Sequence, residues 1–162
     1  MSQYDDIAGP GGKEILRQLY SAEIPLADCP MAADVVDDYL NTGNIVPAPP
    51  AIGISLFNIT ANWRLIRRQA LIDYVRSLGA NHHVVVKGIR SPASLQRFLD
   101  ENPPRRLTIT HYFIVANIGN RVYVIDAMGK VIDANVSGYI TGQGFDGLAY
   151  TRSFAASEIV RH

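Results

Sequence analysis

Cys29, the only cysteine of the chain, stands where a helix is predicted to begin. Proline is favoured at the first position of a helix and glycine just beyond its end, so Pro30 and Gly43 place Cys29 close to the N-cap. The helix dipole stabilises a thiolate at that position and lowers the pKa of the thiol. Cys29 therefore has the setting of a nucleophilic cysteine.

His111 and Asp126 fall on segments 107–116 and 121–127, which are rich in β-branched and aromatic residues and flank Ile118-Gly119-Asn120. This pattern predicts a β-hairpin. The two turn residues are either Ile118-Gly119, which sets His111 directly opposite Asp126, or Gly119-Asn120, which makes the two diagonal neighbours. Because side chains alternate along a strand, both registers place them on one face, within reach of a hydrogen bond.

Together these residue types support nucleophilic catalysis by a thiol. Asp126 would accept a hydrogen bond from one ring nitrogen of His111 and favour the imidazolium, and His111 would take the proton of Cys29. The backbone N–H of Cys29 would be one oxyanion donor, and Gln18 is a candidate for the second. The sequence thus nominates Cys29, His111 and Asp126 as a catalytic triad.

Each of these residues also has a structural explanation. A lone cysteine is commonly a small buried hydrophobe, a histidine in a strand is commonly structural, and an aspartate ending a strand is commonly a turn residue. Asp133 competes with Asp126 for the third role. His82-His83 would need a third ligand to hold a metal ion, and we expect this pair at the surface.

The composition is that of one globular domain spanning residues 1–162. Fifteen basic residues balance fifteen acidic ones, which argues against nucleic acid or an anionic membrane as a partner. One cysteine cannot form an internal disulfide, and no Cys/His spacing indicates zinc, so we expect neither a metal nor a cofactor. No apolar run approaches the ~20 residues needed to span a bilayer.

The elements that must position the three residues follow from periodicity and from Gly and Pro signals. Helices are predicted over residues 13–20, 29–43, 60–78 and 91–99, and strands over 84–86, 107–116, 121–127 and 131–136, with one or two short strands in 139–154. Residues 44–58 are predicted as a loop. Helices first and strands afterwards predict an α+β fold, with N-terminal helices packed on an antiparallel β-meander.

Apolar spacing also predicts which helix faces are buried. In the 29–43 helix the buried face would be Ala32, Val35, Val36, Tyr39 and Leu40, and the solvated face Asp34, Asp37, Asp38 and Asn41. In the 60–78 helix the inward residues would be Trp63, Ile66, Ala70, Tyr74 and Leu78, and the solvated basic face Arg64, Arg67, Arg68 and Arg76.

Two stretches resemble the papain-fold toxin domains of bacterial polymorphic toxins and secretion-system effectors. The first, from Asp28-Cys29 through Gly43 to Val46-Pro47-Ala48-Pro49, is similar to that family's cysteine motif, small-residue helix and glycine stop. The second is similar to its His-strand, short turn and Asp-strand, and comprises Ser94-Leu95-Gln96, 111–117, 121–126 and Gly129. The resemblance covers about residues 27–130. Asp28 and Met128 depart from it, because the family often has Asn and a polar residue there.

The resemblance implies a papain-like cysteine hydrolase core with Cys29 as nucleophile, His111 as general base and acid, and Asp126 as the orienting carboxylate. It implies cysteine protease activity or deamidation of protein glutamine side chains, both through a thioester. The expected partners are a protein substrate and an immunity protein that covers the active site. No secretory signal follows Met1, so we expect synthesis in the cytoplasm and delivery into a target cell by a specialised secretion system.

Two other functions stay open. A cell-wall cysteine endopeptidase or amidase has the same order of helix-Cys, strand-His and a polar residue on the next strand. A catalytically inactive papain-like binding module would keep the fold and lack a reactive thiol.

Overall fold

The structure is a computed structural model that describes residues 2–21, 29–47, 57–59, 63–93, 96, 110–152 and 159–161. The helices are α1 (Gln3–Ala8), α2 (Gly12–Leu19), α3 (Cys29–Thr42), α4 (Arg68–Ser77) and α6 (Val136–Gly142). The strands are β1 (Phe57–Ile59), β2 (Arg64–Ile66), β3 (His82–Ile89), β4 (Thr110–Ile118), β5 (Arg121–Asp126), β6 (Val131–Asp133), β7 (Gly147–Thr151) and β8 (Ile159–Arg161). The fold is α+β, as predicted.

Six strands form one antiparallel sheet in the order β2-β7-β3-β4-β5-β6. From β3 to β6 each strand pairs with the next along the chain, which is the predicted meander. β7 pairs with the free side of β3, and β2 pairs with β7 at the edge. β1 and β8 form a separate two-stranded sheet.

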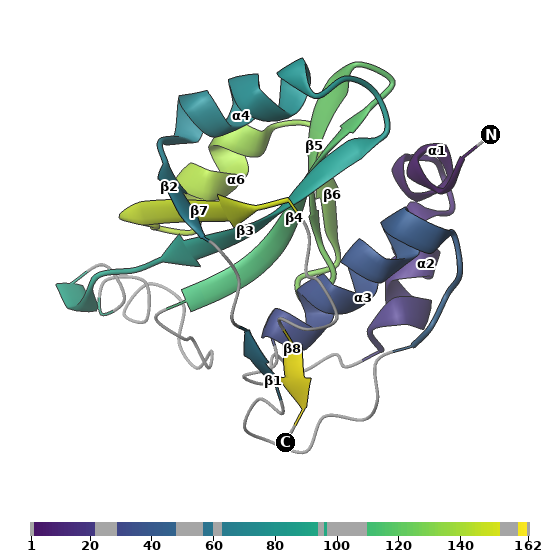
Figure 1. Cartoon of the computed structure of the whole chain (residues 1–162), viewed down its shortest axis with the longest axis horizontal. Helices are drawn as coiled ribbons and strands as arrows, with labels where there is room; N and C mark the ends of the chain where they lie inside the picture. The colour runs from purple at the N-terminus through teal and green to yellow at the C-terminus, as the bar shows by residue number, and fades with distance from the viewer. Residues whose placement is uncertain are drawn as a thin grey trace.

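Helices cover both faces of the six-stranded sheet, with α1, α2 and α3 on one side and α4 and α6 on the other (Figure 1). Alternate residues of β4 show the two faces: Ile114 and Ala116 pack with α1 to α3, whereas Phe113 and Val115 pack with α4 and α6. We call these the α3 face and the α6 face. Because successive side chains of a strand point to opposite faces, the residue number of a central-strand side chain decides which of the two faces it lies on.

The β4–β5 turn selects between the two predicted registers. Ile118 pairs with Arg121, so the turn residues are Gly119 and Asn120. Both have positive φ, +58° and +66°, which is the left-handed backbone that a two-residue hairpin requires and that Gly and Asn tolerate. Ile114 pairs with Ile125, which makes His111 and Asp126 diagonal neighbours.

The predicted helix at Cys29 is confirmed over Cys29–Thr42, and it ends at Gly43 with φ +78°. All five residues predicted to be buried on it are buried. Asp37 was predicted on the solvated face and this is wrong, because its side chain is buried against His83 of β3. A buried hydrogen-bonding partner on another element overrides the local polar pattern.

The helix predicted over residues 60–78 is correct only in its second half. Residues 64–66 form β2, because they pair with β7, and α4 begins at Arg68. The buried residues of α4 are Leu71, Ile72 and Val75, whereas Ala70 is exposed. The predicted inward stripe was therefore rotated on the helix.

Three further elements differ from the predictions. α1 was not predicted. It begins at a capping box, in which the Ser2 side chain accepts a hydrogen bond from the backbone N–H of Asp5 and the Asp5 side chain accepts one from the backbone N–H of Ser2. The strand predicted to reach residue 136 ends at Asp133, and α6 follows, capped by Asn135. β1 (Phe57–Ile59) overlaps the end of the predicted 44–58 loop, and its last residue, Ile59, directly precedes the predicted 60–78 helix. Most of the predicted 91–99 helix lies outside the described residues.

In the described part of the chain, every helix is either too short or too polar to cross a membrane.

Candidate functional site

His111 and Asp126 form a direct hydrogen bond on the α6 face of the sheet. Nε2 of His111 lies 2.9 Å from Oδ2 of Asp126. Both residues are buried, with exposed fractions of 8% and 4%. The hairpin parity predicted from the sequence therefore holds, and the imidazole and carboxylate meet.

Tyr139 of α6 is a third member of this cluster. Its hydroxyl donates to Oδ2 of Asp126 at 2.7 Å and lies 3.2 Å from Nε2 of His111. The backbone N–H of Gly129 donates to the other carboxylate oxygen at 3.2 Å. Asp126 is thus held by the turn between β5 and β6 and by α6, so its orientation does not depend on His111 alone.

These contacts set the charge of Asp126. Burial raises the pKa of the Asp126 carboxyl, but the charge and hydrogen bond of His111, the Tyr139 hydroxyl and the Gly129 amide together hold the pKa below its usual value. An ionised carboxylate beside Nε2 favours a proton on that nitrogen. Asp126 and Tyr139 both contact His111 through Nε2, so the two groups fix the imidazole from the same side of its ring.

Aromatic rings enclose the imidazole. The His111 ring stacks on Phe113 at 6.0 Å and on Phe145 at 6.3 Å between centroids. Phe145 lies over Gly88, which pairs with His111 across β3 and β4; a Cβ on Gly88 would come within 2.6 Å of the Phe145 ring. The glycine therefore makes room for the ring that covers His111.

The structure does not bring Cys29 onto this face. Cys29 is the first residue of α3, as predicted, but its side chain lies outside the described part of the structure. α3 packs on the α3 face, on the side of the sheet opposite to His111. Of the three nominated residues, the described contacts join His111 with Asp126 only.

The other candidates from the sequence have ordinary positions. Gln18 is exposed on α2. Asp133 ends β6, is exposed, and accepts a hydrogen bond from the backbone N–H of Asn135. Its role is that of a turn residue, so it does not compete with Asp126 for His111. Asp28 lies outside the described residues.

A second histidine cluster lies on the α3 face, and it corrects the prediction that His83 is at the surface. His83 is 5% exposed, with Nε2 2.6 Å from Oδ1 of Asp37 and Nδ1 2.6 Å from the Tyr4 hydroxyl. Burial and the charge of Asp37 raise the pKa of Tyr4 to about 12, so the phenol keeps its proton. His82 is exposed, as predicted.

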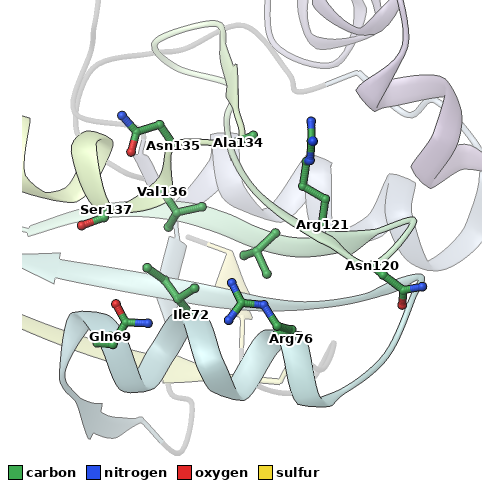
Figure 2. A pocket seen from close by; sticks show the side chains of 10 residues that line it. Gln69, Ile72, Arg76, Asn120, Arg121, Ala134, Asn135, Val136 and Ser137 are labelled. Atoms are coloured by element: carbon green, nitrogen blue, oxygen red, sulfur yellow. The ribbon is translucent and has the colours of Figure 1, made fainter.

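Two cavities open on the α6 side of the molecule. One, of about 360 Å³, lies between α4, the β4–β5 turn and the start of α6. Figure 2 shows that its two arginines do not converge: Arg76 extends along α4 toward the cavity, whereas Arg121 runs away from it. The other, of about 410 Å³, is bounded by β2, the start of α4, the end of α6 and Phe145. No group of three potential metal ligands occurs among the residues that the structure describes.

No protein-family model, curated protein or solved structure matches the chain. The candidate site therefore rests on the contacts and distances described above.

Sequence reasoning missed Tyr139 and the second cluster. Tyr139 lies in a Gly-rich segment read as strand, and the available signal was the Asn135 N-cap followed by apolar residues at Val136 and Ile140. The His83–Asp37 pair left no local signal, because its partners are 46 residues apart.

Proposed function

We propose that this chain is a papain-like cysteine hydrolase of the toxin type, which acts on amides of a protein target. Cys29 is the nucleophile, His111 the general base and acid, and Asp126 the orienting carboxylate. The observation that supports this best is the buried His111–Asp126 hydrogen bond, made through Nε2 at 2.9 Å. It is the arrangement that fixes an imidazole for proton transfer through its other nitrogen.

The reaction proceeds in two balanced steps. Nδ1 of His111 takes the thiol proton, and the sulfur attacks the amide carbon. The C–N bond breaks as the same proton passes to the departing nitrogen, which leaves a thioester on Cys29. Water then gives a proton to His111 and its oxygen to the acyl carbon, and the thiol is restored with that proton. Ammonia leaves when the amide is a glutamine side chain, and an amine leaves when it is a peptide bond.

The approach of Cys29 to His111 is supported by the level at which each element begins. α3 and β4 run in the same direction (Figure 1), and Asp37 of α3 is level with His83, the strand partner of Ala116. From Asp37 back to Cys29 a helix rises about 12 Å, and from Ala116 back to His111 a strand extends about 17 Å. Cys29 is therefore near the level of His111, the second residue of β4, and the proposed reaction requires the thiol to reach the imidazole from the opposite face of the sheet.

The experiment that tests this proposal is conversion of glutamine-containing peptides and proteins by the purified chain, followed by mass spectrometry. Deamidation shows as the mass gain of glutamine becoming glutamate, and proteolysis shows as fragments. Cys29→Ala should lower the rate by about 10³-fold or more, with the fold retained. Turnover by Cys29→Ala at the wild-type rate would refute the proposal.

Two further assays separate the two other functions. Lysis of cells that export the chain, with no effect of cytosolic expression, would favour a cell-wall endopeptidase or amidase. Wild-type protein that binds a target but leaves every amide intact would favour a binding module.

A further inference from the structure

We infer that the cavity beside Phe145 binds acidic side chains of the protein segment that carries the target amide. This inference rests on the proposed function for the identity of the segment, and it assigns a substrate class that the His111 site does not by itself specify. We call this space, lined by Ile66–Arg68, Ile140, Thr141 and Gly144–Leu148, the Phe145 cavity.

The Phe145 cavity is next to His111. Phe145 lines it, and the same ring stacks on the imidazole with centroids 6.3 Å apart and planes 21° apart. Arg90, itself buried, supports this arrangement: its guanidinium lies 4.8 Å from the Phe145 ring and donates to the backbone oxygen of Gln143. A ligand in the cavity would therefore be separated from the His111–Asp126 pair by the Phe145 ring.

The charge at the cavity is positive. Arg67 and Arg68 both line it. Arg68 donates to Thr141 Oγ1 at 2.6 Å, so its guanidinium is placed by α6 without being neutralised by that contact. Within the described residues no ion pair is formed by Arg67 or Arg68. Asp146 also lines the cavity, and its carboxylate accepts from the backbone N–H of Ser91, so the lining carries two positive charges and one negative charge. Guanidinium groups that line one cavity favour carboxylate ligands.

The walls fit a peptide better than a free anion. Ile66, Ile140 and Leu148 supply apolar surface beside the two arginines. Ile66 ends β2, which is the edge strand of the sheet, and Leu65 on that strand is 83% exposed. An edge strand can pair with an extended segment of another chain. An extended segment advances ~3.3 Å per residue, so acidic residues a few positions from the target glutamine are the ones that the cavity would contact.

The second cavity provides a matched control. Arg76 lines that cavity, lies on the same helix as Arg68, and pairs with Asp73 at 3.3 Å. Reversing the charge of Arg76 changes the net charge of the protein as much as a single reversal at the Phe145 cavity does. Any effect of overall charge on binding would appear in both variants.

The test is binding of fluorescein-labelled peptides to the full chain carrying Cys29→Ala, measured by fluorescence anisotropy at low ionic strength. The three peptides share a central glutamine and differ only in flanking residues, which are glutamate, serine or lysine. The glutamate peptide should bind at least about tenfold more tightly than the serine peptide, and added salt should reduce the difference. Arg67→Glu and Arg68→Glu should each remove most of this preference, and Arg76→Glu should retain it.

Equal affinity for the glutamate and serine peptides would overturn the inference, and so would equal loss of preference in Arg76→Glu and Arg67→Glu. Because binding is measured without the nucleophile, the result does not depend on catalysis. Peptide preference with no turnover by the wild type would refute the hydrolase and keep the binding site. Equal turnover of the three peptides, whatever their flanking residues, would refute the binding site and keep the hydrolase. Circular dichroism of each variant confirms that it is folded.

Discussion

Two clusters of the same composition, each a buried histidine and aspartate with a tyrosine, lie on opposite faces of one sheet. His83, Asp37 and Tyr4 join β3, α3 and α1 on the α3 face. His111, Asp126 and Tyr139 join β4, β5 and α6 on the α6 face. Their histidines are nearly equally buried, with exposed fractions of 5% and 8%, so burial does not distinguish the two clusters.

The ring nitrogens distinguish them. His83 uses Nε2 for Asp37 and Nδ1 for Tyr4, so both nitrogens are engaged by the two partners. At His111 both Asp126 and Tyr139 are at Nε2, at 2.9 and 3.2 Å, and neither uses Nδ1. The first arrangement ties three elements together. The second holds the imidazole through Nε2 alone as far as Asp126 and Tyr139 are concerned, which is the orientation that the proposed acid–base role needs.

The largest effect on stability is expected at the first cluster. His83→Ala leaves the Asp37 carboxylate and the Tyr4 hydroxyl buried without their common partner, which should cost about 3 kcal/mol and lower Tm by roughly 6–12 °C. Thermal or urea unfolding measures this. His82→Ala, at the adjacent exposed position, should change stability by less than about 0.5 kcal/mol. Equal effects of the two substitutions would mean that the His83 cluster is not structural.

The loss of folding stability at acid pH should depend on the cluster of His111, Asp126 and Tyr139. Because the pKa of Asp126 is lowered in the folded state, its ionised form stabilises the fold at pH values above the ordinary carboxyl pKa, near 4. This stabilisation is lost as the pH falls from that value toward the lower pKa of the folded state. Asp126→Asn should be less stable at pH 7 by about 2 kcal/mol and should lose less stability between pH 4 and pH 2.

Urea midpoints measured across this pH range test the expectation, with Asp73→Asn as the surface variant of equal charge change. An acid limb of wild-type steepness in Asp126→Asn would show that another carboxyl is responsible for it.

The smallest effect is expected for Tyr139→Phe. The substitution removes one hydrogen bond to Asp126 and keeps the ring that packs on Phe113, so stability should fall by about 1 kcal/mol. Since Asp126 keeps His111 and Gly129, kcat/KM should fall by no more than about tenfold. Loss of activity as complete as that of Cys29→Ala would make Tyr139 part of the catalytic machinery rather than a group that positions Asp126.

The hairpin was predictable because its information is local. Gly119 and Asn120 fit a turn that needs two positive φ angles, and strand alternation then places His111 and Asp126 together whichever register forms. The buried stripe of α3 was predictable for the same reason, since its apolar residues recur with the helical period.

The remaining features depend on pairings far apart in sequence. β2 was read as helix because its partner β7 lies more than eighty residues away. Asp37 was read as solvated because its partner is on β3. The face of the sheet on which α3 packs is a property of the tertiary arrangement, and no local pattern encodes it.

The most direct test of the central claim is the rate at which iodoacetamide alkylates Cys29, measured against pH in the wild type and in His111→Ala. Cys29 is the only cysteine, so the label reports this residue alone. If His111 and Asp126 activate the thiol, the wild type should react at pH 6 at least about tenfold faster than free cysteine, and His111→Ala should return the profile to that of an ordinary thiol. A wild-type profile that matches free cysteine, or one that His111→Ala leaves unchanged, would contradict the account.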